Sequence, residues 1–259
     1  MLYSASRRTD LPAFYPMEIV GKVRRSRKLE GIVFWTKDIR NFTTHLELSA
    51  IIREAPAIIQ FTCTGLGGSQ WEPRVPPLDI QLDALATLAT RLPPAAIRWR
   101  FDPIIPTPDW RERFLQVKEK LTVVLGKSGL DGVTVSFVDP YLKARVRVAA
   151  AGLAWPEVKP EDKRETLAFL ASSFGERKKE GPKPLRLCCE AEFLDQPGVE
   201  AAACVDRRLL ERLYNLKAGE VKKDPGQRRD CTCSSATDIG SYALPCQHGC
   251  LYCYANPKI

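Results

Sequence analysis

The sequence predicts an α/β fold, a partial or closed β/α barrel of about six units with a cysteine-rich cap at its C-terminal end. Two observations predict it. Apolar runs alternate with helical stretches along residues 1–194, and each run ends in polar side chains that a buried strand would not choose. Because the strand ends of a β/α barrel meet at one face, these side chains are expected to converge. A doubly wound open sheet is the alternative, since its strand ends also carry polar loop residues.

The first two units set this pattern. Tyr3–Thr9 is a short run with a polar end, and a helical stretch follows from about Phe14 to Lys28. Gly31–Asp38 repeats the run, and its polar end leads into a helical stretch through roughly Glu54. Repeated strand-then-helix units predict parallel strands joined by right-handed crossovers.

The third and fourth units have longer connections. Ala57–Gly65 is an apolar run, and a Gly/Pro-rich loop separates it from the helical stretch Leu78–Leu92. Ala96–Pro106 is the next run, followed by a helix from about Asp109 to Leu125. Each run is therefore expected to be a strand of the same sheet.

The fifth and sixth units complete the predicted barrel. Gly132–Pro140 is the fifth run, and the charged helix Pro160–Lys179 precedes the sixth run, Leu185–Glu192. Residues 195–259 break the pattern, because they show one helical stretch, Arg207–Lys217, among Gly, Pro, Cys and charged residues. We expect bound metal to order this cap across the mouth of the barrel, since it lacks regular elements.

Composition indicates a soluble globular protein of the cytoplasm. Hydrophobic residues make up 44% and charged residues 27% of the 259 residues, and no apolar run reaches about 18 residues, so we expect no membrane partner. The N-terminus lacks the apolar region of a secretion signal. In a reducing compartment the nine cysteines are expected to include metal ligands. The net charge of +8 permits a nucleic-acid partner, although a diffuse charge of this size also serves solubility.

The most informative motif is a C-x3-C-x2-C run near the end of the sequence, formed by Cys246, Cys250 and Cys253. Three thiolates on one short loop can converge on a single metal centre. A structural zinc site and a ferredoxin cluster each take four protein ligands. A four-iron cluster held by three cysteines would keep one iron open, as a catalytic centre requires.

These cysteines, with Tyr252 before the last of them, resemble the signature loop of radical S-adenosylmethionine (SAM) enzymes. The resemblance implies a [4Fe-4S] cluster, SAM bound at the open iron, a reductant such as ferredoxin or flavodoxin, and a substrate attacked by a 5′-deoxyadenosyl radical. It also implies a partial barrel, and Tyr252 is a candidate for contacting adenine. In that family the loop follows the first strand, so we expect the fold to return residues 246–253 to that strand.

Four further cysteines predict a second metal centre. Cys231 and Cys233 form a close pair, and Cys189 and Cys204 lie at and after the sixth strand. Four thiolates suit a fully ligated [4Fe-4S] cluster or zinc equally well. Cys188 is expected to point to the opposite face of the strand from Cys189 and to stay out of the site. Alternatively, some of these cysteines are small buried hydrophobic residues.

Strand-end side chains supply the remaining candidates. Arg100, Asp102 and Glu190 are predicted to act on SAM or substrate as catalytic residues, and Ser136 to bind the cofactor. A structural salt link between Arg100 and Asp102 is the alternative. No Ser/His/Asp constellation and no phosphate-binding Gly-rich motif is present, which argues against a hydrolase.

Two further resemblances bear on family and substrate. Arg100–Pro106 is similar to a segment of the spore photoproduct lyase group of radical SAM proteins. Longer stretches, including Ser6–Phe14, Val33–Lys37 and the terminal cysteine loop, resemble a bacterial family catalogued only as a domain of unknown function. The lyase-like stretch and the positive charge favour a nucleic acid or nucleotide substrate. A non-catalytic nucleic-acid-binding protein that depends on zinc or an iron-sulfur cluster is the alternative.

Overall fold

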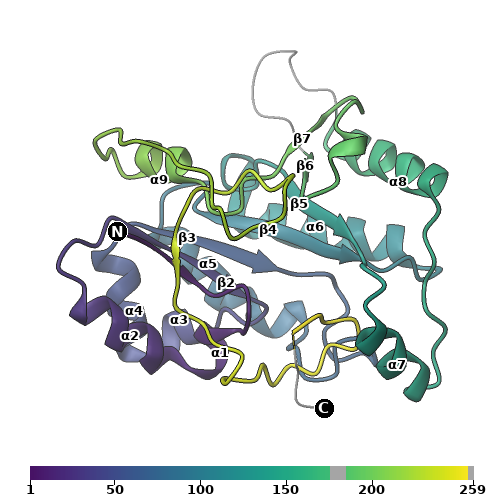
Figure 1. Ribbon diagram of the computed structural model, residues 1–259, viewed down its shortest axis with the longest axis horizontal. Helices are drawn as coiled ribbons and strands as arrows, with labels where there is room; N and C mark the ends of the chain where they lie inside the picture. The colour runs from purple at the N-terminus through teal and green to yellow at the C-terminus, as the bar shows by residue number, and fades with distance from the viewer. Residues whose placement is uncertain (176–184, 256–259) are drawn as a thin grey trace.

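The computed structural model describes residues 1–175 and 185–255, and its centre is one sheet of eight parallel strands (Figure 1). The first six strands fall in the predicted runs, because these runs are apolar enough to be buried on both faces. The strands are β1 (Leu2–Ala5), β2 (Gly31–Thr36), β3 (Ala57–Thr62), β4 (Ile97–Ile104), β5 (Val133–Phe137), β6 (Leu185–Leu187), β7 (Val199–Ala201) and β8 (Thr237–Asp238).

The strand order follows the chain. The order is β7-β6-β5-β4-β3-β2-β1-β8, so strands β1 to β7 lie side by side in sequence and β8 adds to the free edge of β1. A doubly wound sheet reverses its order at a switch point, and this sheet does not. Within the described residues β7 and β8 are not paired with each other. The predicted α/β fold with a parallel sheet is therefore confirmed, and closure into a barrel stays a prediction.

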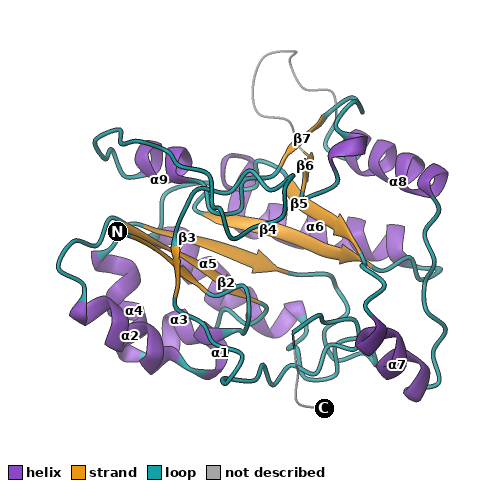
Figure 2. Cartoon of the chain, viewed as in Figure 1, coloured by secondary structure: helices purple, strands orange, loops and turns teal. Residues whose placement is uncertain are grey.

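Helices alternate with the strands, as Figure 2 shows. Two helices were not predicted from the sequence, α7 and the short η2. The helical stretches before β3 are interrupted, because Pro16 starts a second helix after Tyr15 and His45 caps another. The helices are α1 (Leu11–Phe14), α2 (Pro16–Arg25), α3 (Asn41–Thr44), α4 (Leu46–Glu54), η1 (Leu78–Gln81), α5 (Leu82–Arg91), α6 (Trp110–Gly129), α7 (Leu142–Ala150), α8 (Pro160–Ser172), η2 (Ala191–Phe193) and α9 (Arg207–Leu213).

Both faces of the sheet are covered. Alternate strand residues such as Phe34 and Phe61 pack in the main core with side chains of α2, α4, α5, α6 and α8. Val33 and Ile58 point to the other face, where they pack against α9 and the cysteine-rich segment around Cys204. Figure 2 shows α9 on the side of the sheet away from α2 and α4. Burial on both faces explains why the strands are nearly continuous apolar runs.

One expectation about the last quarter of the chain is wrong. Residues 195–259 were expected to hold one helix only, yet Val199–Ala201 and Thr237–Asp238 are strands of the main sheet. These strands have three and two residues, too few to show a period. The division into a barrel of residues 1–194 and a cap stays a prediction. The end of the predicted helix Pro160–Lys179 lies outside the described residues, and α8 ends at Ser172.

No helix among the described residues is long and apolar enough to cross a membrane.

Candidate functional site

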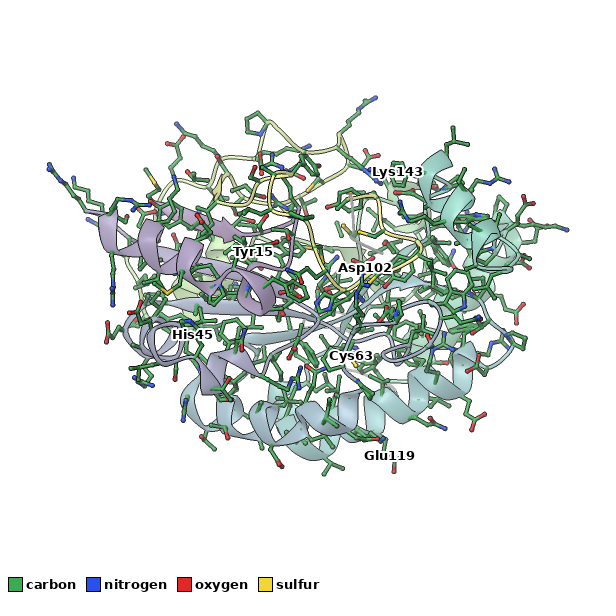
Figure 3. The ribbon with its side chains drawn as sticks, turned by 90° about the horizontal axis from the view of Figure 1, so that it is seen from below. Tyr15, His45, Cys63, Asp102, Glu119 and Lys143 are labelled. Carbon is green, nitrogen blue, oxygen red and sulfur yellow. The ribbon has the colours of Figure 1, made fainter. Side chains whose placement is uncertain are left out.

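One cavity of about 510 Å³ lies where the strand ends meet the C-terminal segment. Asp102, labelled in Figure 3, lines it beside that segment, drawn in yellow. All the site residues predicted from the sequence line the same cavity, and their roles stay predictions. They are Arg100, Asp102, Ser136, Cys189, Glu190, Cys204, Cys231, Cys233, Cys246, Cys250, Tyr252 and Cys253.

The terminal cysteine loop brings its thiols together. Cys250 is buried, Cys246 and Cys253 are half-buried, and Gly249 adopts the positive φ of 71° that turns the chain between them. Burial raises the pKa of Cys246 to about 12 and also raises the pKa values of Cys250 and Cys253. The carboxylate of Asp10 raises the pKa of Cys246 further, and that of Glu72 raises the pKa of Cys250. The raised pKa values favour neutral thiols, and a bound cation would favour their ionised form.

Contacts from several elements hold this loop against the strand ends. The backbone amide of Leu251 donates to Trp71 O at 3.0 Å, and that of Arg74 donates to His248 O at 3.2 Å. From α7, Arg147 Nε donates to Leu251 O at 3.1 Å. Figure 1 shows the C-terminal segment running past α1 to the neighbourhood of α7. The loop is thus fixed by the β3–α5 connection and by α7.

Asp10 and His248 join the first βα loop to the cysteine loop. His248 Nε2 lies 2.8 Å from Asp10 Oδ2, and both side chains are buried. The same oxygen accepts from Thr36 Oγ1 at 3.0 Å and from the backbone amide of Lys37 at 2.8 Å. The other ring nitrogen of His248 faces Arg74 O at 3.4 Å. His248 therefore serves to position the loop.

A buried ion pair lies under the loop. Lys37 Nζ is 2.9 Å from Glu72 Oε1, which also accepts from Thr64 Oγ1 at 2.7 Å and from the hydroxyl of Tyr252. Glu72 is only 1% exposed. Burial alone would raise its pKa, but Lys37 and the hydroxyl donors lower it overall. Burial alone would lower the pKa of Lys37, but the carboxylate of Glu72 raises it overall. Tyr252 lines the cavity, and its hydroxyl is occupied by the hydrogen bond to Glu72.

The second group of cysteines contains five members and not four. Strand β6 ends at Leu187 and Cys189 has a φ of 59°, so Cys188 and Cys189 do not alternate across a strand. Their sulfur atoms are 3.9 Å apart, and the expectation that Cys188 faces away is wrong. Thiol contacts run around this five-cysteine set in the order Cys189, Cys188, Cys204, Cys233, Cys231 and back to Cys189.

Two arginines surround this set. Arg100 Nη1 donates to Cys204 Sγ at 2.7 Å. The guanidinium groups of Arg100 and Arg7 lie over the ring of Trp35, at 4.9 and 5.4 Å from its centroid. Contacts with the thiols of Cys204 and Cys231 lower the pKa of Cys233, and Arg7 lowers it further. The pKa values of the other four thiols are raised by neighbouring thiols and by burial, so the surroundings favour a negative charge at Cys233 and disfavour further ones.

The predicted catalytic side chains are paired with one another. Arg100 Nη2 and Ser136 Oγ donate to the two carboxylate oxygens of Asp102. Burial would raise the pKa of Asp102, but Arg100 and Ser136 lower it. Glu190 accepts from the backbone amide of Phe137 at 3.1 Å and from Lys163 Nζ at 2.8 Å. Asp102 is thus an ionised carboxylate held in place, and Glu190 is held by its two donors. The salt link considered as an alternative for Arg100 is present.

Neither group of cysteines has the geometry of a finished metal site. Among residues 1–175 and 185–255, no group of three or more His, Cys, Asp or Glu side chains is arranged so that it could hold a metal ion. Two buried polar atoms of residues that line the cavity, Arg7 Nη2 and Thr9 Oγ1, have no hydrogen-bond partner within the described part of the chain. A buried polar atom without a partner is costly.

Comparison with known proteins gives a family and no activity. A family model described as "Domain of unknown function (DUF1848)" matches residues 16–255. The chain belongs to this family. No curated protein and no solved structure matches it. The resemblance to a family of unknown function is confirmed, and the DUF1848 fold here comprises a parallel sheet and a cavity lined by cysteines.

Sequence reasoning missed part of this DUF1848 site. Glu72 lies in a Gly/Pro-rich loop, where an acid is normally solvated, and it is instead the buried partner of Lys37. Asp10 binds His248 of the cysteine loop. The only sequence signal for this role was the position of Asp10 just after the first strand. The involvement of Arg7, Trp35 and the full five-cysteine set depends on contacts between distant segments.

Proposed function

We propose that this protein is a radical SAM-like enzyme, in which Cys246, Cys250 and Cys253 hold a [4Fe-4S] cluster that reductively cleaves SAM. The observation that carries the proposal is the shared cavity: the three thiols of the terminal loop face the same space as the strand-end polar residues. A cofactor bound by these cysteines would therefore lie next to a substrate bound by the strand ends.

The donor chemistry fits such a cluster. Thiolates are the usual ligands of iron-sulfur clusters, and three of them leave one iron free. Because the thiols do not have ligand geometry, loading would require rearrangement of their side chains, coupled to proton release. When bound, the cluster would supply the electron for cleavage of SAM.

The chain's own residues would bind and orient. Arg7 and Thr9 line the cavity, and a shift of their side chains would bring Arg7 Nη2 and Thr9 Oγ1, which lack partners among the described residues, to polar groups of SAM or substrate. Lys37 and Glu72 keep Tyr252 and the cysteine loop in place, and water is excluded around their buried ion pair. Cofactor chemistry of this kind needs few protein acids or bases, in agreement with an Arg100–Asp102 pair that is already satisfied.

Further parts of the proposal concern the surroundings of this centre. The sheet, whose strand order follows the chain, would curve as a partial barrel with residues 195–259 as its cap. The five-cysteine set would hold a second [4Fe-4S] cluster or zinc, with Arg7 and Arg100 balancing its negative charge. A cytoplasmic reductant such as ferredoxin or flavodoxin would supply electrons.

A second candidate function is non-catalytic. The five-cysteine set has enough thiols for a zinc site. The net charge of +8 is compatible with a protein that binds nucleic acid and depends on zinc for its fold.

The deciding experiment is anaerobic reconstitution with iron, sulfide, dithionite and SAM. We expect 5′-deoxyadenosine from the wild type and from Cys63→Ala, because Cys63 is a buried cysteine outside the cavity. We expect none above background from Cys250→Ala. If the wild type and Cys250→Ala both form 5′-deoxyadenosine only at the background level, the proposal of a radical SAM-like enzyme is rejected and the non-catalytic nucleic-acid-binding protein is favoured.

A further inference from the structure

The mouth of the cavity carries the exposed tyrosines of this protein. Of the seven tyrosines, the exposed ones are Tyr141, Tyr242 and Tyr254, with exposures of 38%, 61% and 42%, and each lines the cavity. They come from the β5–α7 loop and from two places in the C-terminal segment. We call these residues the tyrosine rim. Exposed aromatic rings gathered at one opening are typical of a site that binds flat ligands.

Two arginines accompany the rim. The guanidinium of Arg8 lies 5.5 Å from the centroid of the Tyr242 ring, and Arg228 Nη2 donates to the Tyr141 hydroxyl at 2.7 Å. The rings of Tyr141 and Tyr254 also contact each other, with centroids 6.1 Å apart. The rim therefore offers ring faces with a cation beside them, the combination that suits a base followed by a phosphate.

Charge at the rim is nearly balanced. Asp139 pairs with Arg228 at 2.5 Å, and Asp238 lies 3.7 Å from Arg8. Ordinary polyelectrolyte attraction is therefore weak at this opening, and stacking must supply most of the affinity. Paired and stacked bases of a duplex do not present their faces, so a ligand recognised in this way is single-stranded.

We propose that single-stranded nucleic acid binds across the tyrosine rim and places one nucleotide at the opening of the cavity. The cavity, of about 510 Å³, has the size of a single small-molecule site, so a nucleotide at its opening would lie beside a cofactor held further inside. This inference rests on the proposed function, because it assumes that the reaction takes place in the cavity. It adds that the substrate of that reaction is a single-stranded nucleic acid.

The test is fluorescence anisotropy with short labelled single strands of DNA and of RNA, using the full chain purified anaerobically. We expect a single strand of at least one kind to bind more tightly than the duplex of the same sequence. Tyr242→Ala is expected to weaken binding about 5- to 150-fold, the usual effect of removing one stacking ring, and Tyr242→Phe to preserve it. Leu142→Ala is the matched control, since Leu142 is 78% exposed and does not line the cavity.

Salt dependence gives a second readout. Arg8 and Arg228 can contact one or two phosphates. A plot of the logarithm of the association constant against the logarithm of the salt concentration should therefore have a slope of about −0.7 to −1.4. Absence of binding at low salt, equal affinity for duplex, or equal effects of Tyr242→Ala and Leu142→Ala would overturn the inference. Formation of 5′-deoxyadenosine without oligonucleotide tests the proposed function separately, so the two failures are distinguishable.

Discussion

Removing the charge of Glu72 should cost more stability than any substitution of a surface acid. Glu72 is 1% exposed and lies 2.9 Å from Lys37. Glu72→Gln keeps an acceptor for Thr64 and Tyr252 but leaves the Lys37 ammonium buried without a counter-charge. Breaking a buried pair in this way costs about 3–5 kcal/mol, a large share of the roughly 5–15 kcal/mol that stabilises a domain. Urea denaturation followed by circular dichroism measures this free energy of unfolding.

A double variant separates the charge effect from packing. Adding Lys37→Met to Glu72→Gln removes the uncompensated ammonium, so the double variant should recover part of the lost stability, with a coupling energy of about 0.5–3 kcal/mol. Glu165→Ala is the control, because Glu165 pairs with Arg111 on the surface and such pairs contribute about 0–1 kcal/mol. Strictly additive effects of the two substitutions would refute the reasoning.

The same pair predicts a pH dependence. The pKa of Glu72 is lowered in the fold, so its contribution is present above the unfolded value of about 4.3 and is lost as pH falls through the folded pKa. The pKa of Lys37 is raised, so its contribution is full below about 10.4 and is lost as pH rises through the folded pKa. Glu72→Gln should weaken the loss of stability on acidification. Unchanged acid sensitivity would contradict this.

Two further predictions concern the cysteines and a close approach of the chain. The double variant Cys231→Ala, Cys233→Ala should lose metal measured after anaerobic purification, while keeping the roughly four irons of the terminal loop; unchanged metal content would show that no second centre exists. Gly240→Ala should cost about 1–3 kcal/mol in thermal unfolding, because an added Cβ would lie 1.8 Å from Ser6 Oγ. Gly226→Ala, where the nearest atom is 3.4 Å away, should change stability by under about 0.5 kcal/mol, and equal shifts would contradict the close contact.

The sequence predicted most of the sheet because β1 to β6 are apolar runs buried on both faces. It missed β7 and β8, which hold three and two residues and depend on neighbouring strands for their conformation. Strand-end polar residues such as Asp102 were predictable as a group, since parallel strands share one edge. The shared cavity was thus foreseeable from topology.

Individual contacts of the site were less predictable. The turn at Cys189, with its positive φ, brings Cys188 into the five-cysteine set, and nothing in the local sequence signals that turn. The pairing of Asp10 with His248 joins residues 238 positions apart. Such contacts depend on how the C-terminal segment crosses the sheet, which no local pattern encodes.

The central claim is that the terminal loop holds a cluster with an iron open to SAM. Electron paramagnetic resonance of the dithionite-reduced protein, with and without SAM, tests it most directly. We expect a reduced [4Fe-4S] signal that shifts when SAM is added. This SAM-sensitive signal should remain in Cys63→Ala and be lost in a variant with Cys246, Cys250 and Cys253 replaced by Ala, while the signal of a second cluster in the five-cysteine set would not respond to SAM. Absence of any SAM-sensitive signal in the wild type, or a SAM-sensitive signal that survives loss of the three cysteines, would contradict the central claim.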